Sequence, residues 1–267
     1  MRKSDFYEVY QANLKMLERE INLVKKSIQV TLGRKLWLQE NGSDNSKVSS
    51  CEEDITAGTQ LYTFLICSWL EARLMKMLYE SSNAAFTDNE IFLVRNFPTM
   101  TIKWKECFSM AVCKSYGFTY ISEQNYANNF SNGSISQQNY QDVFSLFVDI
   151  DDAITIRNRL AHGQWYKQFN SKNKKLVNYP FLNLYTNVQK LDILRQYYNE
   201  IADIISSYVT YKDKANSNFD SGIQNKIVSI REKKKRILNS KFDSYCQPFK
   251  RIEHNKMEAF KRKLNTI

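Results

Sequence analysis

The fold is decided by residues 59–81, TQLYTFLICSWLEARLMKMLYES, which contain the longest apolar run of the chain, 61–70. A helix drawn through these residues is apolar on most sides, through Leu61, Phe64, Leu65, Trp69, Leu70, Leu74, Met77 and Leu78. A helix that is apolar all round is buried, so we expect it to lie in the middle of a helical bundle. Ser68 interrupts the run, which is far shorter than the roughly 20 residues that a membrane span requires. We therefore expect no insertion into a membrane.

The residues before this segment predict one long amphipathic helix over 4–40, with an apolar stripe and a charged back. The apolar positions follow a spacing of three and four, at Tyr7, Tyr10, Leu14, Leu17, Ile21, Val24, Ile28 and Leu32. Residues 41–53 are polar and small and contain Gly42, so we expect them to form a loop.

The residues after it repeat the helical pattern. Thr87 and Glu90 have the spacing of a capping box and open a short helix that ends before Pro98. Longer helices are expected over 101–116, 140–165 and 183–211, and loops over 118–139 and 167–178. No strand alternates convincingly and no repeat is visible, so the fold class is all-α, an antiparallel helical bundle.

The charge of the chain is concentrated at its C-terminal end. The formal net charge is +10, and residues 212–267 carry 15 basic and 6 acidic side chains. With 267 residues, one or two domains are expected. We divide the chain into a bundle over 1–211 and a basic helical segment over 212–267, joined by a hinge at 216–222. The basic segment favours a polyanion or an acidic partner, or it is simply a solvated charged helix face.

The cysteines and the N-terminus indicate the compartment. Five cysteines are an odd number, and Cys67 and Cys113 lie in apolar helical patterns, so we expect reduced thiols in a cytoplasmic chain. The N-terminal residues lead into an amphipathic helix rather than an apolar run, so we expect no signal peptide.

Few residues are suited to catalysis. The chain has two histidines, His162 and His254, with no zinc spacing, no glycine-rich phosphate loop and no nucleophile elbow, so we expect no metal and no cofactor. What remains is IRNRLAHG over 156–163. At about 100° per residue, Arg157, Asn158 and His162 share one helix face around Ala161, while Leu160 points to the core.

This motif resembles the Arg-x4-6-His signature of the HEPN superfamily, in which a polar residue commonly follows the arginine. The segment 68–74, SWLEARL, is also similar to the second helix of some bacterial HEPN nucleases of defence and toxin systems. The resemblance covers about residues 1–211. It implies a homodimer that acts as a metal-independent endoribonuclease, with Arg157 and His162 of both protomers in one composite active site and Asn158 in support.

The side chains of Arg157 and His162 are also suited to RNA cleavage without a metal. Without metal ligands, RNA cleavage needs an internal nucleophile, a proton acceptor and a cation for the developing phosphorane charge. The 2′-hydroxyl is the nucleophile, His162 can move the proton and Arg157 can hold two phosphate oxygens. One histidine cannot be both base and acid, so two copies are needed, and 2′,3′-cyclic phosphate ends would follow.

Other residues are candidates for supporting roles. Glu71 can orient Arg157 or belong to a core ion pair, and Asp151 can hold Arg157 or face solvent. Arg159 can contact phosphate at the rim of the site. Contacts to the RNA backbone are expected from Lys233, Lys234, Lys235 and Arg236. His254 is expected to be a surface residue.

These observations leave three functions open. The first is a HEPN-type ribonuclease of toxin or antiviral defence systems, with RNA as substrate, a second copy as partner, an antitoxin or defence protein as regulator, and no membrane. The second is a non-catalytic module that binds nucleic acid or a protein through its basic segment. The third is a protein that binds the surface of an anionic membrane through residues 223–264.

Overall fold

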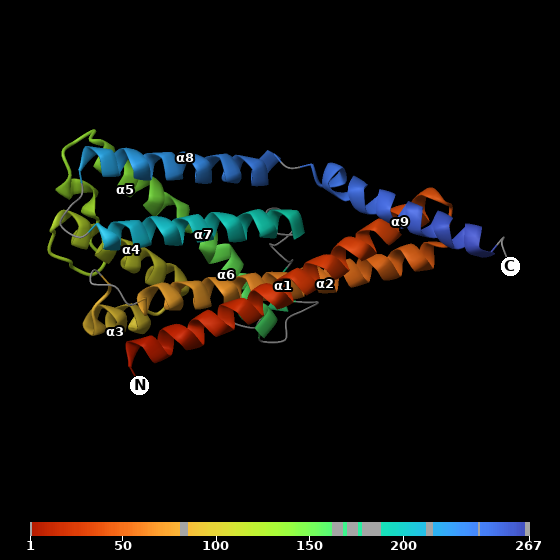
Figure 1. The fold of residues 1–267 in the computed structure, drawn as a ribbon, viewed down its shortest axis with the longest axis horizontal. Coiled ribbons are helices and arrows are strands. Elements are labelled where there is room, and N and C mark those ends of the chain that lie inside the picture. The colour runs from red at the N-terminus through yellow and green to blue at the C-terminus, as the bar shows by residue number, and fades with distance from the viewer. Residues whose placement is uncertain are drawn as a thin grey trace. The chain divides into compact units, whose positions relative to one another are not determined.

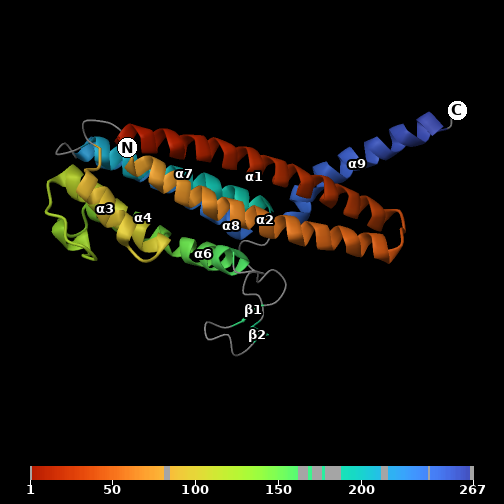
Figure 2. The ribbon, with the colours of Figure 1, turned by 90° about the horizontal axis from the view of Figure 1, so that it is seen from below.

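The computed structural model describes residues 2–80, 85–161, 168–169, 176–177, 188–211, 216–239 and 241–264. In these residues the fold is all-α, as predicted. The helices are α1 (Lys3–Glu40), α2 (Asn45–Leu78), α3 (Asp88–Asn96), α4 (Met100–Tyr116), η1 (Tyr126–Asn129), α5 (Ile135–Leu146), α6 (Val148–Ala161), α7 (Val188–Thr210), α8 (Ser217–Asn239) and α9 (Phe242–Leu264) (Figure 1). Two strands of two residues each, β1 (Gln168–Phe169) and β2 (Leu176–Val177), pair antiparallel in the segment predicted as a polar loop (Figure 2).

The chain divides into two compact units. The first unit comprises Met1–Leu17, Cys67–Thr155 and Ile193–Leu238, and the second comprises Glu18–Ile66, Ile156–Asp192 and Asn239–Ile267. Helices α1, α2, α6 and α7 therefore contribute residues to both units. Of the predicted basic segment, α8 belongs to the first unit and α9 to the second.

The long helix predicted at the N-terminus is confirmed as α1. Leu14, Ile21, Ile28 and Leu32 of the predicted apolar stripe are buried. The prediction of a charged back was wrong in one respect. Val9, Met16, Leu23 and Val30 recur every seven residues on that side and are 48–58% exposed. The back of α1 is thus a mixed apolar and charged surface.

The loop predicted over 41–53 is much shorter in the structure, because α2 already begins at Asn45. Gly42 turns the chain with φ of 63°. The Asp44 carboxylate then accepts hydrogen bonds from the backbone nitrogen (3.0 Å) and the hydroxyl (2.8 Å) of Ser46. These bonds lower the pKa of Asp44 and cap the start of the helix. A polar composition was therefore a poor guide here, since polar residues also form the exposed first turns of a helix.

The predicted central helix is buried as expected, and α4 is buried on most of its sides as well. Trp69, Leu70, Leu74 and Leu78 of α2 are all buried. In the first unit, the ring of Phe108 on α4 lies 5.4 Å from Tyr140, 5.9 Å from Phe147 and 5.7 Å from Tyr208, measured between ring centroids. Aromatic side chains from α4, α5 and α7 therefore form the core of this unit.

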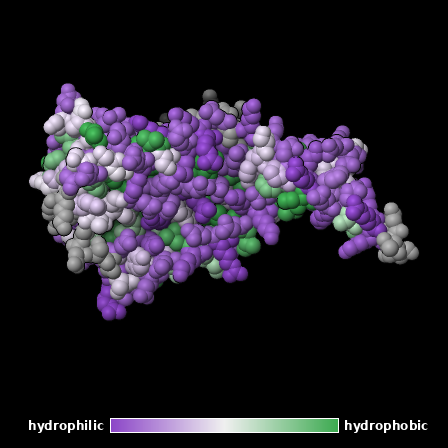
Figure 3. All heavy atoms as spheres, turned by 45° about the horizontal axis from the view of Figure 1, so that its top comes forward, coloured by the Kyte–Doolittle hydropathy of each residue, from purple (hydrophilic) through white to green (hydrophobic). Residues whose placement is uncertain are grey.

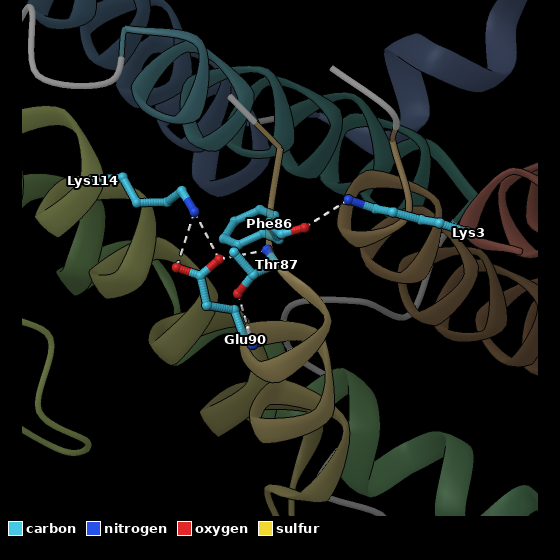
Figure 4. A network of polar contacts seen from close by, with 5 residues as sticks. All are labelled: Lys3, Phe86, Thr87, Glu90 and Lys114. Carbon is cyan, nitrogen blue, oxygen red and sulfur yellow. Dashed lines mark hydrogen bonds and ion pairs between the residues drawn. The ribbon is translucent and has the colours of Figure 1, made fainter. Parts of the chain in front are cut away.

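Helix α3 is fixed by the network drawn in Figure 4. The predicted capping box is confirmed, with the Thr87 side chain accepting from the Glu90 backbone and the Glu90 side chain accepting from the Thr87 backbone. Lys114 of α4 donates to both carboxylate oxygens of Glu90, at 3.0 and 2.7 Å. Lys3 of α1 donates to the carbonyl of Phe86 at 2.6 Å. These contacts join α3 to α4 and to the start of α1.

The helix predicted over 140–165 is divided into α5 and α6 at Phe147. The side chain of Phe147 is buried, and the Leu146 carbonyl accepts a hydrogen bond from the Tyr197 hydroxyl at 2.7 Å. This contact with α7 satisfies a carbonyl at the end of α5. Helix α5 itself begins earlier than predicted, after a turn at Gly133, whose φ is 73°. Periodicity alone cannot detect such a break, because the apolar spacing continues across it.

The hinge predicted over 216–222 was wrong, because α8 begins at Ser217. The Asn216 side chain accepts hydrogen bonds from the backbone nitrogens of Asn218 (3.1 Å) and Phe219 (3.0 Å), as an N-cap does. Phe219 and Asp220 are buried in the first turn. The small polar residues thus mark the start of a packed helix. Figure 1 shows α8 alongside α7. The Lys226 side chain of α8 donates a hydrogen bond to the Ser207 hydroxyl of α7 at 2.8 Å.

In the second unit, α9 packs against the C-terminal half of α1 (Figure 1). Gly33 lies directly against the Phe249 backbone, where a Cβ added to the glycine would come within 2.5 Å of the Phe249 carbonyl oxygen. Gln29 donates to the Tyr245 hydroxyl at 2.9 Å. The absence of a side chain at residue 33 is therefore what allows the two helices to approach so closely.

Candidate functional site

The C-terminal turns of α6 contain the motif that the sequence singled out. Residues 156–161 belong to the second unit, together with the start of α7. There, Asp192 of α7 pairs with Lys25 at 2.9 Å and accepts from the Tyr62 hydroxyl at 3.3 Å. These two contacts hold the first turns of α7 on α1 and α2.

The two faces of this end of α6 differ as predicted. Leu160 is buried, Asn158 and Ala161 are exposed, and Arg157 is half-buried. The Arg157 Nη1 atom donates to the Asn158 Oδ1 atom at 3.1 Å. The structure therefore brings the guanidinium and the amide together on the side of the helix that solvent reaches. Arg159 is half-buried.

The helix end suits arginine for an electrostatic reason. The last carbonyls of a helix carry a partial negative charge, which stabilises a cation in the last turn, here Arg159. The same partial negative charge repels an anion, so a phosphate would bind at this end of the helix only through contacts to a guanidinium. The Arg157 guanidinium can offer a planar pair of N–H donors to two phosphate oxygens.

Two of the predicted site residues fall outside what the structure describes. His162 follows the last residue of α6 in the sequence and lies outside the described residues, and so does the side chain of Asp151. Glu71 is described, and it is half-buried on α2.

The predicted RNA-binding residues of α8 differ in their surroundings. Lys233 pairs with Glu200 of α7 and donates to Ser229 at 3.1 Å. Lys235 pairs with Glu232 one turn away at 2.8 Å, and both partners are exposed. Lys234 is half-buried and Arg236 is exposed. The contact to Glu200 ties Lys233 to the bundle, which leaves Lys235 and Arg236 as the more accessible cations.

The thiols and carboxylates of the described residues indicate structural roles. All five cysteines are buried and free of disulfides, and burial raises the pKa of Cys113 and of Cys246 to about 11. In the part of the chain that is described, no three His, Cys, Asp or Glu side chains are grouped as metal ligands. None of its helices combines the length and apolar character that crossing a membrane requires.

A second accessible region is the C-terminal half of α9, residues 254–264, which lies within the segment 223–264 that the sequence left open as a membrane-binding surface. His254 is exposed there, as predicted, and so are Phe260 (57%) and Leu264 (56%); Ile252, just before this region, is 64% exposed as well. The sequence could not show which apolar side chains of α9 the rest of the fold covers. Figure 3 shows the wider setting on one face, a largely hydrophilic surface with small separate apolar patches.

Comparisons of the chain with protein-family models, with curated proteins and with solved structures found no match.

Proposed function

We propose that this protein is a metal-independent endoribonuclease of the HEPN type, a cytoplasmic toxin or antiviral defence effector that acts as a homodimer. The observation that carries the proposal is the pairing of Arg157 with Asn158 on the open side of the last turns of α6, with Leu160 buried beneath them. In the Arg-x4-6-His signature a polar residue commonly follows the arginine, as Asn158 does here. The role of His162 rests on its place in the sequence.

In the proposed reaction the 2′-hydroxyl of a ribose attacks the adjacent phosphorus, and the bond to the 5′-oxygen of the next nucleotide breaks. His162 of one protomer accepts the proton of the 2′-hydroxyl, and His162 of the other donates a proton to the departing 5′-oxygen. The Arg157 guanidinium binds the phosphate oxygens as charge builds on them. The products carry a 2′,3′-cyclic phosphate and a 5′-hydroxyl.

The first test is cleavage of total RNA by the purified full-length protein in EDTA. We expect cleavage, with 5′-hydroxyl ends that a polynucleotide kinase labels directly. Arg157→Ala and His162→Ala should each lower the rate by about 10²-fold or more. Arg19→Ala, which removes an exposed arginine from α1, is the matched control and should retain the wild-type rate. Absence of cleavage, or cleavage that survives in both motif variants, contradicts the proposal.

The composite site has a test of its own. Wild-type protein is mixed and allowed to exchange subunits with an Arg157→Ala/His162→Ala double variant at constant total concentration. If each site needs both protomers, activity falls with the square of the wild-type fraction. A linear fall would mean that each chain carries a complete site and would refute the shared one.

A second candidate function is favoured by the exposed cations of the basic segment on α8. Lys235 and Arg236 are both exposed there. A non-catalytic module that binds nucleic acid or an acidic protein through them would show no cleavage in the first test, but it would show salt-dependent binding.

A further inference from the structure

The fold leaves little of the apolar stripe of residues 223–264 available to a partner. Ile223, Ile227 and Ile230 of α8 are buried in the first unit. In the second unit, Cys246 is buried and Phe249 lies against Gly33 of α1. Val228 and Ile252 are exposed singly, and the longest accessible part among the described residues is the part of α9 that follows Glu253, about 16 Å of helix at 1.5 Å per residue.

This free part of α9 has one apolar arc. At 100° per residue, Met257, Phe260 and Leu264 fall within about 60° of one another, in line with the buried part of the stripe. Met257 is half-buried, whereas Phe260 and Leu264 are more than half exposed. The apolar stripe therefore continues past the point at which α1 covers it.

The lysines of this region lie along the edges of the arc. Lys256 and Lys263 are about 40–60° outside it on one side, and Lys261 is about 40° outside it on the other. All three are exposed. Glu253 contacts Lys256 at 3.4 Å and Glu258 contacts Lys261 at 2.9 Å, so each of these two lysines has an acidic neighbour one turn away. Over 254–264 the cations Lys256, Lys261, Arg262 and Lys263 still outnumber the one acidic side chain, Glu258.

Each possible occupant places a different demand on such a surface. A second copy of α9 would bring like charges together. The phosphate backbone of RNA is bound by cations, and the apolar side chains of Met257 and Leu264 do not contribute to that binding. A bilayer with anionic lipids uses both features, because apolar side chains enter the boundary of the acyl chains while flanking lysines extend to the headgroups.

We propose that the C-terminal half of α9, residues 254–264, binds the surface of an anionic membrane. The helix lies in the plane of the headgroups, with Phe260 and Leu264 inserted and Lys256, Lys261 and Lys263 on lipid phosphates. This proposal replaces the expectation that no membrane is a partner. It does not depend on the ribonuclease proposal, since α9 is separate from the Arg157 motif in sequence and its test measures no cleavage.

The experiment is flotation of the full-length protein with vesicles of phosphatidylcholine alone or of equal parts phosphatidylcholine and phosphatidylglycerol. We expect binding to the anionic vesicles only, weakened as salt rises. Phe260→Ser/Leu264→Ser should lower the affinity by about tenfold or more, because two inserted side chains are lost. The matched control is Val228→Ser, an exposed apolar position on α8, which should bind as the wild type does.

A second set of variants separates the charges from the apolar arc. Replacing Lys256, Lys261 and Lys263 together by Gln should lower binding to anionic vesicles by about tenfold or more. Replacing the exposed Lys15, Lys26 and Lys47 by Gln removes the same charge elsewhere and should change binding much less.

The emission of an environment-sensitive fluorophore attached to α9 measures whether residue 260 enters the bilayer. Because all five native cysteines are buried, Phe260→Cys offers one accessible thiol for an environment-sensitive fluorophore. Its emission should shift to the blue on anionic vesicles, whereas the same dye at Val228→Cys should not change.

Three outcomes would overturn the proposal. The first is no binding to the anionic vesicles, and the second is unchanged binding by Phe260→Ser/Leu264→Ser. The third is an unshifted dye at residue 260 together with tight binding of a single-stranded RNA oligonucleotide that the Gln variant loses. That result would make the end of α9 a polyanion site instead.

Discussion

Removal of the carboxylate of Asp220 is the sharpest test of how α8 is held on the first unit. Asp220 is buried in the first turn of α8. Its carboxylate accepts hydrogen bonds from the hydroxyl of Tyr116 on α4 and from the hydroxyl of Ser136 on α5, the latter at 2.7 Å. Its backbone carbonyl accepts from the Asn139 amide at 2.9 Å. One residue therefore connects three helices.

The size of the effect follows from these bonds. A hydrogen bond to an ionised group contributes about 1.5–3 kcal/mol, and Asp220→Ala removes two of them while leaving two hydroxyls without their acceptor. The cost of burying the carboxylate disappears in the same variant, which offsets part of the loss. We expect Asp220→Ala to lower the free energy of unfolding by about 2–4 kcal/mol. Asp220→Asn keeps one acceptor oxygen and should cost about half as much.

The assay is urea unfolding followed by circular dichroism, with the free energy taken from the midpoint at constant slope. Tyr116→Phe completes a double-mutant cycle. It should cost about 1–2 kcal/mol in the wild type and close to nothing in Asp220→Ala, because the partner is already gone. A loss below about 0.5 kcal/mol for Asp220→Ala, or an equal cost of Tyr116→Phe in both backgrounds, would refute the role of this contact.

Three further predictions concern local packing, titration and capping. Gly33→Ala should destabilise the packing of α9 by about 1–3 kcal/mol, because the new methyl group would overlap the Phe249 carbonyl, and faster amide exchange in α9 would reveal it. Gly222→Ala is its control, since no other atom lies within 4 Å of the new methyl group, and it should raise the melting temperature through helix propensity. The raised pKa of Cys246 means that the folded chain holds its thiol proton more tightly than the unfolded chain does. Stability should therefore fall by about 1–3 kcal/mol from pH 9 to pH 11, and Cys246→Ala should flatten this part of the pH profile of urea unfolding. Thr87→Ala removes the cap of α3 and should cost about 1 kcal/mol in urea unfolding, and no change would show that Glu90 and its lysine hold the helix alone.

The success of the predictions depended on the range of the interactions behind each feature. The capping box at Thr87 and the buried stripe through Ile21 were predicted correctly, because each depends on residues within two turns of a helix. The loop over 41–53 and the hinge over 216–222 were wrong. In both places, a composition typical of loops belongs to capped helix starts, and at 216–222 the helix is also packed through Asp220.

Of the candidate residues, the sequence predicted the local arrangement along one helix but not the contacts between helices. The closeness of Arg157 and Asn158 follows from helix geometry, and the expectations that Leu160 is buried and Asn158 exposed are met. The contact of Lys233 with Glu200 could not be predicted, because 33 residues of chain separate the two partners.

The sequence by itself determined that this protein is helical, where most of its helices lie and which stripe of each is apolar. These properties follow from periodicity and from hydrogen bonds between neighbouring residues. Only the tertiary structure decided which apolar stripes are covered: that α8 is packed through Ile227, that α9 crosses α1 at Gly33, and that Phe260 is left exposed. The reason is physical. An apolar stripe has the same sequence signature whatever covers it, and its partner is chosen by shape and charge that only the folded chain brings together.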